Sequence, residues 1–195
     1  QGTAESVTSG ATSAVSNIND AASVAISGTA TEDQVLTATV TDEDGAAGTI
    51  TYTWKRAGTA ISSATSSTYT LVQADVGSAI TVSVSFTDDY SNGETATSDA
   101  TSAVANVNDA GSGLSLASDG DVADPDEDDV LSISGTLADE DGVTGASPTY
   151  VWSTGATSST LTLGQTNVGS TISVVISYTD DQSESNTITL TADSD

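Results

Sequence analysis

Hydrophobic and polar residues alternate one by one along several short runs of this chain. In residues 80–86, Ile-Thr-Val-Ser-Val-Ser-Phe, every second position is apolar, and residues 172–178 repeat the pattern with Ile172, Val174, Ile176 and Tyr178. A period of two residues is typical of a β-strand with one buried face. The pattern predicts an all-β fold. In the better-defined half of the chain, strands are expected at residues 35–41, 49–56, 68–72, 79–87 and 96–104.

An internal repeat organises these strands. Residues 11–20 recur almost unchanged at 100–109, Trp54 has a counterpart in Trp152, and the motif Asp-Glu-Asp-Gly occurs twice. A repeat of about 90 residues has the size of an immunoglobulin-like β-sandwich and is too long for a solenoid unit. We therefore predict tandem immunoglobulin-like β-sandwich domains joined by short linkers, with the two tryptophans in their cores. The expected parts are 1–20, the last strand and linker of a preceding repeat, then 21–109, a repeat with its outgoing linker, and 110–195, a second, diverged repeat.

The charge of the chain narrows the possible partners and activities. There are 28 acidic residues against 2 basic ones and a formal net charge of −26, and the chain has no histidine and no cysteine. Nucleic acids and anionic membranes attract basic surfaces, so we expect neither as a partner, and no apolar run is long enough to insert into a membrane. Without histidine or cysteine the usual general base and a common nucleophile are missing, and we expect no enzyme.

The acidic residues are concentrated in loops and linkers. In an immunoglobulin-like sandwich, the loops after strands 35–41 and 79–87 lie where the chain enters, and the remaining acidic loops lie where it leaves. Carboxylates and asparagines from neighbouring repeats should then meet at the linkers, as oxygen ligands for Ca²⁺. The alternative is a set of solvated acidic loops, which we favour for the run 119–129. The candidate ligands are Asn19, Asp20, Glu32, Asp33, Asp42, Asp44, Asp75, Asp88, Asp89, Asn106, Asn108, Asp109, Asp139, Asp141, Asp180 and Asp181.

Four segments of the chain resemble the immunoglobulin-like extender repeats of giant RTX-type bacterial adhesins. They are residues 52–54, 69–77, 80–89 and 100–109. The linker Asn-x-Asn-Asp is also similar to the Ca²⁺-binding Asp-x-Asn-Asp-Asn linker of cadherins. The resemblance implies a secreted spacer on a bacterial cell surface, stiffened by Ca²⁺ between repeats. It departs from the cadherin pattern at Asn17 and Asn106, which replace aspartates, and at Asn167, which replaces the counterpart of Asp75. These departures favour one or two ions per junction. By position, the implied ligands are Glu32, Asp33, Asp75, Asn106, Asn108, Asp109, Asp139 and Asp141.

Two other functions fit the sequence. Residues 1–16 read as an isolated strand, which could complete a neighbouring subunit by strand addition and build a filament, with Val7 and Val15 as the buried contacts. A carbohydrate-binding module would instead need exposed aromatic side chains, for which Tyr90 is the best candidate.

Overall fold

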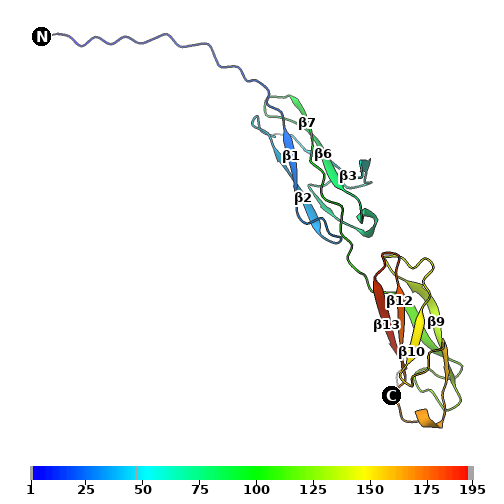
Figure 1. The fold of residues 1–195 in the computed structure, drawn as a ribbon. Coiled ribbons are helices and arrows are strands. Elements are labelled where there is room, and N and C mark those ends of the chain that lie inside the picture. The colour runs from blue at the N-terminus through cyan, green and yellow to red at the C-terminus, as the bar shows by residue number, and fades with distance from the viewer. Residues whose placement is uncertain (1, 47, 193–195) are drawn as a thin grey trace. The chain divides into compact units, whose positions relative to one another are not determined.

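The computed structural model describes residues 2–46 and 48–192, and it consists of antiparallel β-sheets connected by turns (Figure 1). The first sandwich contains β1 (Ser23–Ser27), β2 (Val35–Thr41), β3 (Thr51–Arg56), β4 (Thr59–Ala60), β5 (Thr68–Thr70), β6 (Ile80–Thr87) and β7 (Gly93–Thr97). The second contains β8 (Ser112–Ser118), β9 (Val130–Ala138), β10 (Thr149–Trp152), β11 (Thr160–Thr162), β12 (Ser173–Thr179) and β13 (Ser185–Thr191). Two short 3-10 helices, η1 (Gln73–Asp75) and η2 (Gln165–Asn167), precede β6 and β12.

The first sandwich packs the sheet β1-β2-β5 against the sheet β4-β3-β6-β7. The alternation along β6 places Ile80, Val82, Val84 and Phe86 in the core, in agreement with the sequence pattern. Trp54 on β3 is fully buried, and its indole N–H donates a hydrogen bond to the Ser66 carbonyl at 2.9 Å. An aromatic side chain of this size, with its one polar atom satisfied, anchors the core of a domain with few other aromatic residues.

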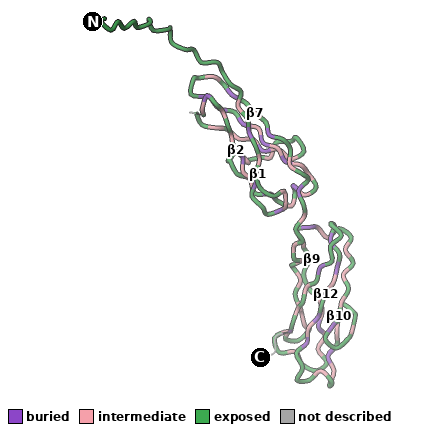
Figure 2. Tube along the Cα trace, turned by 60° about the vertical axis from the view of Figure 1, so that its left-hand side comes forward, coloured by how far each residue is buried: buried purple, intermediate pink, exposed green. Residues whose placement is uncertain are grey.

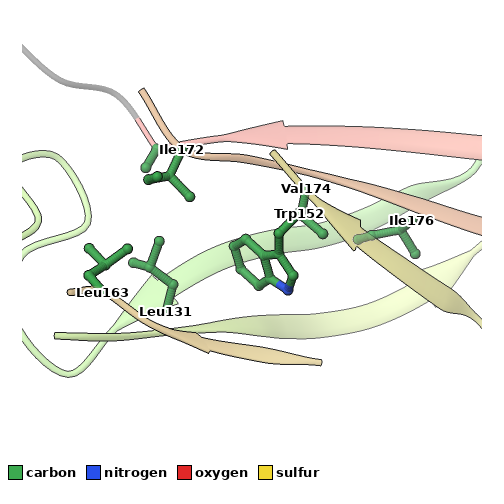
Figure 3. Close-up of a cluster of buried hydrophobic side chains, with 7 residues drawn as sticks. Leu131, Trp152, Leu163, Ile172, Val174 and Ile176 are labelled. Atoms are coloured by element: carbon green, nitrogen blue, oxygen red, sulfur yellow. The ribbon is translucent and has the colours of Figure 1, made fainter. Parts of the chain in front are cut away.

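The second sandwich repeats this construction with the sheets β11-β9-β8 and β10-β12-β13. Trp152 lies at the centre of the buried cluster (Figure 3), and its indole N–H donates to the Ser158 carbonyl at 2.8 Å. The cluster consists of Leu131, Trp152, Leu163, Ile172, Val174, Ile176 and Ala192. The prediction of an all-β chain with tandem immunoglobulin-like sandwiches is thereby confirmed.

The chain divides into two compact units that do not follow the chain order strictly. The first unit comprises residues 1–30, 34–71 and 77–104. The second comprises 105–195 together with two short loop segments, 31–33 and 72–76. The segment 31–33, which contains Glu32, therefore belongs to the same unit as residues 105–195.

Three strands are shorter than the sequence pattern predicts or are shifted. β3 begins at Thr51 instead of residue 49, and β5 ends at Thr70 instead of residue 72. The pattern places the terminal strand at 96–104, whereas β7 spans Gly93–Thr97. Beyond Thr97, only every third backbone N–H donates a hydrogen bond to β6 or to the residues just before β6. Residues 98–104 therefore follow the same sheet edge without forming a regular strand.

The N-terminal segment, residues 2–22, contains no strand in the described part of the chain. Figure 2 shows residues 2–21 exposed, whereas the buried residues lie within the two sandwiches and their loops. Among the described residues, no helix is long and apolar enough to cross a membrane.

Candidate metal centre

Three carboxylates from distant parts of the sequence converge in the second unit. Glu32 lies in the loop between β1 and β2, Asp109 precedes β8, and Asp141 follows β9. One oxygen of each lies within 4.8 Å of the others. Glu32 and Asp141 are each only 2% exposed, and Asp109 is half-buried. Acidic side chains are seldom this buried unless something compensates their charge.

The backbone of residues 105–109 positions this triad. The Glu32 N–H donates to the Ala105 carbonyl at 2.9 Å, and the Val107 N–H donates to Glu32 Oε2 at 3.2 Å. Two residues further on, the Asp109 N–H donates to Asp141 Oδ2 at 2.9 Å. Both buried carboxylates therefore accept a hydrogen bond from one short stretch of chain, through backbone N–H groups two residues apart.

The electrostatics of the triad favour a bound cation. Burial raises the pKa of Glu32, the Val107 N–H opposes that rise, and repulsion from Asp109, Asp141 and Asp33 adds to it. Burial likewise raises the pKa of Asp109, and repulsion from three neighbouring aspartates raises it further. The two basic residues of the whole sequence are adjacent on β3, in the first unit, so no lysine or arginine belongs to the unit that holds this cluster.

Two buried side-chain oxygens without a hydrogen-bond donor also favour a bound cation. Asp141 Oδ1 is buried and accepts no hydrogen bond from any described group, and Asn106 Oδ1 is in the same situation. A buried acceptor without a donor costs about 1–3 kcal/mol. Carboxylate and amide oxygens are the ligands that Ca²⁺ takes, usually about six to eight of them with water included. The residues present therefore fit a Ca²⁺ ion held by Glu32, Asp109 and Asp141.

Asp33 and Asp139 lie beside the triad. Asp33 adopts a left-handed backbone conformation with φ of 62°, which non-glycine residues rarely do. The Asp139 Oδ1 atom accepts the Asp141 N–H at 3.0 Å and so shapes the turn that carries Asp141. Both contribute negative charge near Asp109 without belonging to the group of three.

Several other candidate ligands take part in local hydrogen bonds. Asp75 is fully buried, and its carboxylate accepts the Val72 N–H at 2.9 Å at the start of η1. Asn108 forms a reciprocal amide pair with Asn186 at 3.1 and 3.2 Å. Asp180 accepts three hydrogen bonds, from the backbone of the β12–β13 turn and from the Asn186 side chain. The backbone N–H of Asp181 donates to the Gly142 carbonyl at 3.1 Å.

The equivalent candidates of the first unit form a similar arrangement. The Asp20 N–H donates to Asp44 Oδ2 at 2.6 Å, as Asp109 does to Asp141, and Asp42 Oδ1 accepts the Asp44 N–H at 2.8 Å. The Asn19 amide donates to Glu94 Oε1 at 2.8 Å. The remaining two, Asp88 and Asp89, lie in the turn between β6 and β7.

Asp88 is held by that turn. Desolvation acts to raise its pKa, but hydrogen bonds from the Asn92 side chain and from the Asn92 and Tyr90 backbone outweigh it and lower the pKa. Asp89 donates its N–H to the Asp44 carbonyl at 3.3 Å. Tyr90, the aromatic residue considered for sugar stacking, is 61% exposed at the same turn.

One hydrogen bond in the second unit, between Tyr178 and Asp139, is not predicted from the sequence. The Tyr178 hydroxyl donates to Asp139 Oδ2 at 2.5 Å, and desolvation followed by this interaction raises the pKa of Tyr178. Gly111 makes room for it, since a Cβ there would collide with the hydroxyl oxygen. Tyr178 thus connects the start of β8 to the turn after β9.

The first unit differs at both positions. At the repeat offsets, Phe86 stands in place of Tyr178 and Ala22 in place of Gly111. Asp42 Oδ2, the counterpart of the atom bonded by Tyr178, is buried without a hydrogen-bond partner among the described residues. The paired exchange of Tyr with Phe and Gly with Ala is the signal in the sequence that could have revealed this contact.

Comparison with known proteins gives similarity of fold. No protein-family model matches the chain, and no characterised protein sequence matches it either. Among solved structures, three N-terminal domains of the highly immunogenic outer capsid protein Hoc of bacteriophage RB49 align over 88% of this chain and 59% of that chain, with 17% identity and a TM-score of 0.34. A Ca²⁺-stabilised adhesin with which an Antarctic bacterium binds ice aligns over 91% and 50%, with 16% identity and a TM-score of 0.36.

Fibronectin(III)-like modules of CbhA from Clostridium thermocellum align over 84% of this chain and 86% of that chain, with 12% identity and a TM-score of 0.25. The present chain spans only 50–59% of the capsid and adhesin chains. All these similarities are at the level of the β-sandwich fold.

Proposed function

We propose that this chain is a spacer segment of an extracellular adhesin on a bacterial cell surface, and that Ca²⁺ bound by Glu32, Asp109 and Asp141 stiffens it. The observation that carries the proposal is the buried triad with its unpartnered Asp141 oxygen. The repeated sandwich architecture and the lack of histidine and cysteine agree with a mechanical role instead of a chemical one.

The proposed ion acts through chain connectivity. Glu32 belongs to the loop between two strands of the first sandwich, whereas Asp109 and Asp141 flank strands of the second. A single divalent ion on these ligands replaces mutual repulsion by attraction, because each carboxylate then faces a charge of opposite sign. The loop 31–33 is thereby tied to residues 105–141, and the freedom of the connecting residues falls.

The partners of such a segment are neighbouring repeats of the same polypeptide. With a strongly negative surface, the sandwiches repel one another except where a cation is bound, which disfavours lateral association. An array of this kind stays extended and soluble while it holds a binding domain away from the cell.

Calcium binding and its mechanical consequence are tested by two measurements on the same sample. Isothermal titration of the metal-free chain with CaCl₂ is expected to show binding, with Kd of about 10⁻⁴–10⁻³ M as in extracellular modules. Small-angle scattering in EDTA and in about 10 mM Ca²⁺, well above that Kd, is expected to show a narrower distribution of maximum dimensions with the ion. If Ca²⁺ binds without any change in scattering, the proposed stiffening role is wrong. If Ca²⁺ does not bind, the proposed site is wrong.

A further inference from the structure

A closed ring of hydrogen bonds adjoins the carboxylate triad. The Asp109 N–H donates to Asp141 Oδ2 at 2.9 Å, and the Asp141 N–H donates to Asp139 Oδ1 at 3.0 Å. The Tyr178 hydroxyl donates to the other oxygen of Asp139 and accepts a hydrogen bond from the Gly111 backbone. Gly111 is two residues from Asp109, so the chain itself completes the ring. Two members of the ring, Asp109 and Asp141, belong to the triad.

Tyr178 joins the two chain segments of this ring, residues 109–111 and 139–141. It lies on β12, it is 5% exposed, and its hydroxyl is the side-chain donor in a ring whose other donors are backbone N–H groups. The aspartates it holds together repel one another: after burial, repulsion from neighbours that include Asp141 and Asp139 raises the pKa of Asp109. A hydroxyl bonded to a carboxylate makes one of the stronger hydrogen bonds in proteins, which offsets this repulsion.

The first unit has the aspartates without the closed ring. Its two hydrogen bonds between aspartates match those of the second unit. Phe86, however, stands in place of Tyr178, and Asp42 Oδ2 is buried with no partner among the described residues. Ala22, at the position of Gly111, donates its N–H to Glu94 Oε2 at 3.1 Å. The aspartates alone therefore do not close the ring, and the tyrosine with its glycine does.

We propose that Tyr178 is a positioning residue of the metal centre, and that by closing this ring it holds Asp109 and Asp141 in place before an ion binds. Ligands that are already ordered lose less freedom on binding, so the ring raises the affinity for Ca²⁺. The effect on affinity rests on the proposed function. The positioning of the two carboxylates does not, and it is measured without an ion.

Hydrogen exchange of the full chain, resolved by NMR in EDTA, tests the positioning. Tyr178→Phe is expected to speed exchange of the Asp109 and Asp141 amides by about tenfold, because the turn then opens more often. Tyr150→Phe is the matched control, since Tyr150 packs against the same core and its hydroxyl is no part of the ring, and it should leave both amides unchanged. Unchanged exchange in Tyr178→Phe overturns the proposal. So does an equal acceleration of the β12 core amides, which would show only a loss of overall stability.

Gly111→Ala tests the same contact from the other side. A Cβ at this position would collide with the Tyr178 hydroxyl, whereas the backbone of Gly111 is not in the left-handed region and accepts alanine. We expect the same two amides to exchange faster. Combining Gly111→Ala with Tyr178→Phe restores the residue pair of the first unit, and the effect should be smaller than the sum of the two single effects. Additive effects would mean that the two residues do not act through one contact.

Titration with CaCl₂, at a temperature where all variants are folded, measures the consequence for the metal centre. Tyr178→Phe is expected to weaken Ca²⁺ binding about tenfold or more, as substitutions behind metal ligands usually do, and Tyr150→Phe should leave the Kd unchanged. Faster exchange with an unchanged Kd would overturn the role of Tyr178 in the metal centre. If the native chain itself binds no Ca²⁺, the proposed function is wrong, and the exchange in EDTA alone decides whether Tyr178 positions the two carboxylates.

Discussion

Neutralising Glu32 should stabilise the chain in the absence of Ca²⁺ and should reduce the additional stability that Ca²⁺ provides. In the absence of the ion, Glu32 and Asp141 carry like charges on oxygens within 4.8 Å of each other. Two unit charges at that distance repel by about 0.9 kcal/mol in bulk water and about 3.5 kcal/mol at an effective dielectric constant of about 20. Glu32→Gln removes this repulsion, and the new amide oxygen can still accept the Val107 N–H.

We therefore expect the metal-free variant to be more stable by about 1 kcal/mol, which raises the melting temperature of a domain of this size by about 4–8 °C. In about 10 mM Ca²⁺ the native site contributes about 1.4–2.7 kcal/mol for a Kd of about 10⁻³–10⁻⁴ M. A roughly tenfold loss of affinity on losing one charged ligand reduces that contribution to about 0.4–1.4 kcal/mol.

Differential scanning calorimetry in EDTA and in Ca²⁺ measures both effects. Glu184→Gln is the matched control, because it removes the same charge from an exposed side chain of the second unit and should alter neither value appreciably. If Glu32→Gln destabilises the chain in EDTA, the three carboxylates do not repel one another appreciably. If the Ca²⁺-dependent shift in melting temperature keeps its original size, Glu32 does not bind the ion.

Three further results are expected. Tyr178→Phe should cost the second sandwich about 1–3 kcal/mol, because Asp139 loses a hydrogen bond, and only the melting transition of that sandwich should move. Because burial and neighbouring carboxylates raise the folded pKa of Glu32 and Asp109 above their unfolded values, stability in EDTA should rise as the pH falls from neutral through these raised values. In Ca²⁺ the same protonation competes with the ion, and melting curves across this range should show stability falling instead. Trp152→Phe should destabilise the second sandwich by about 2–4 kcal/mol in urea unfolding, since it leaves a void and an unpaired carbonyl.

The sequence by itself determined the fold class and the core. Alternation along residues 80–86 and 172–178 settles which side chains face inward, because a strand turns successive residues to opposite faces. The repeated tryptophans and the repeat length identify two sandwiches of one type. The same reading set out a wide group of acidic candidates, since the loops of a sandwich can be assigned to its poles from the strand order alone.

Only the tertiary structure decided which of those acids meet. Glu32 and Val107 are 75 residues apart in the sequence, and a hydrogen bond between them aligns the triad. Asp75, Asp88 and Asp180 look equivalent to Glu32 as carboxylates, yet their own turns use them as hydrogen-bond acceptors. Whether an acid serves a local turn or a distant site depends on backbone directions and sheet register, which are set by long-range packing and leave no periodic trace in the sequence.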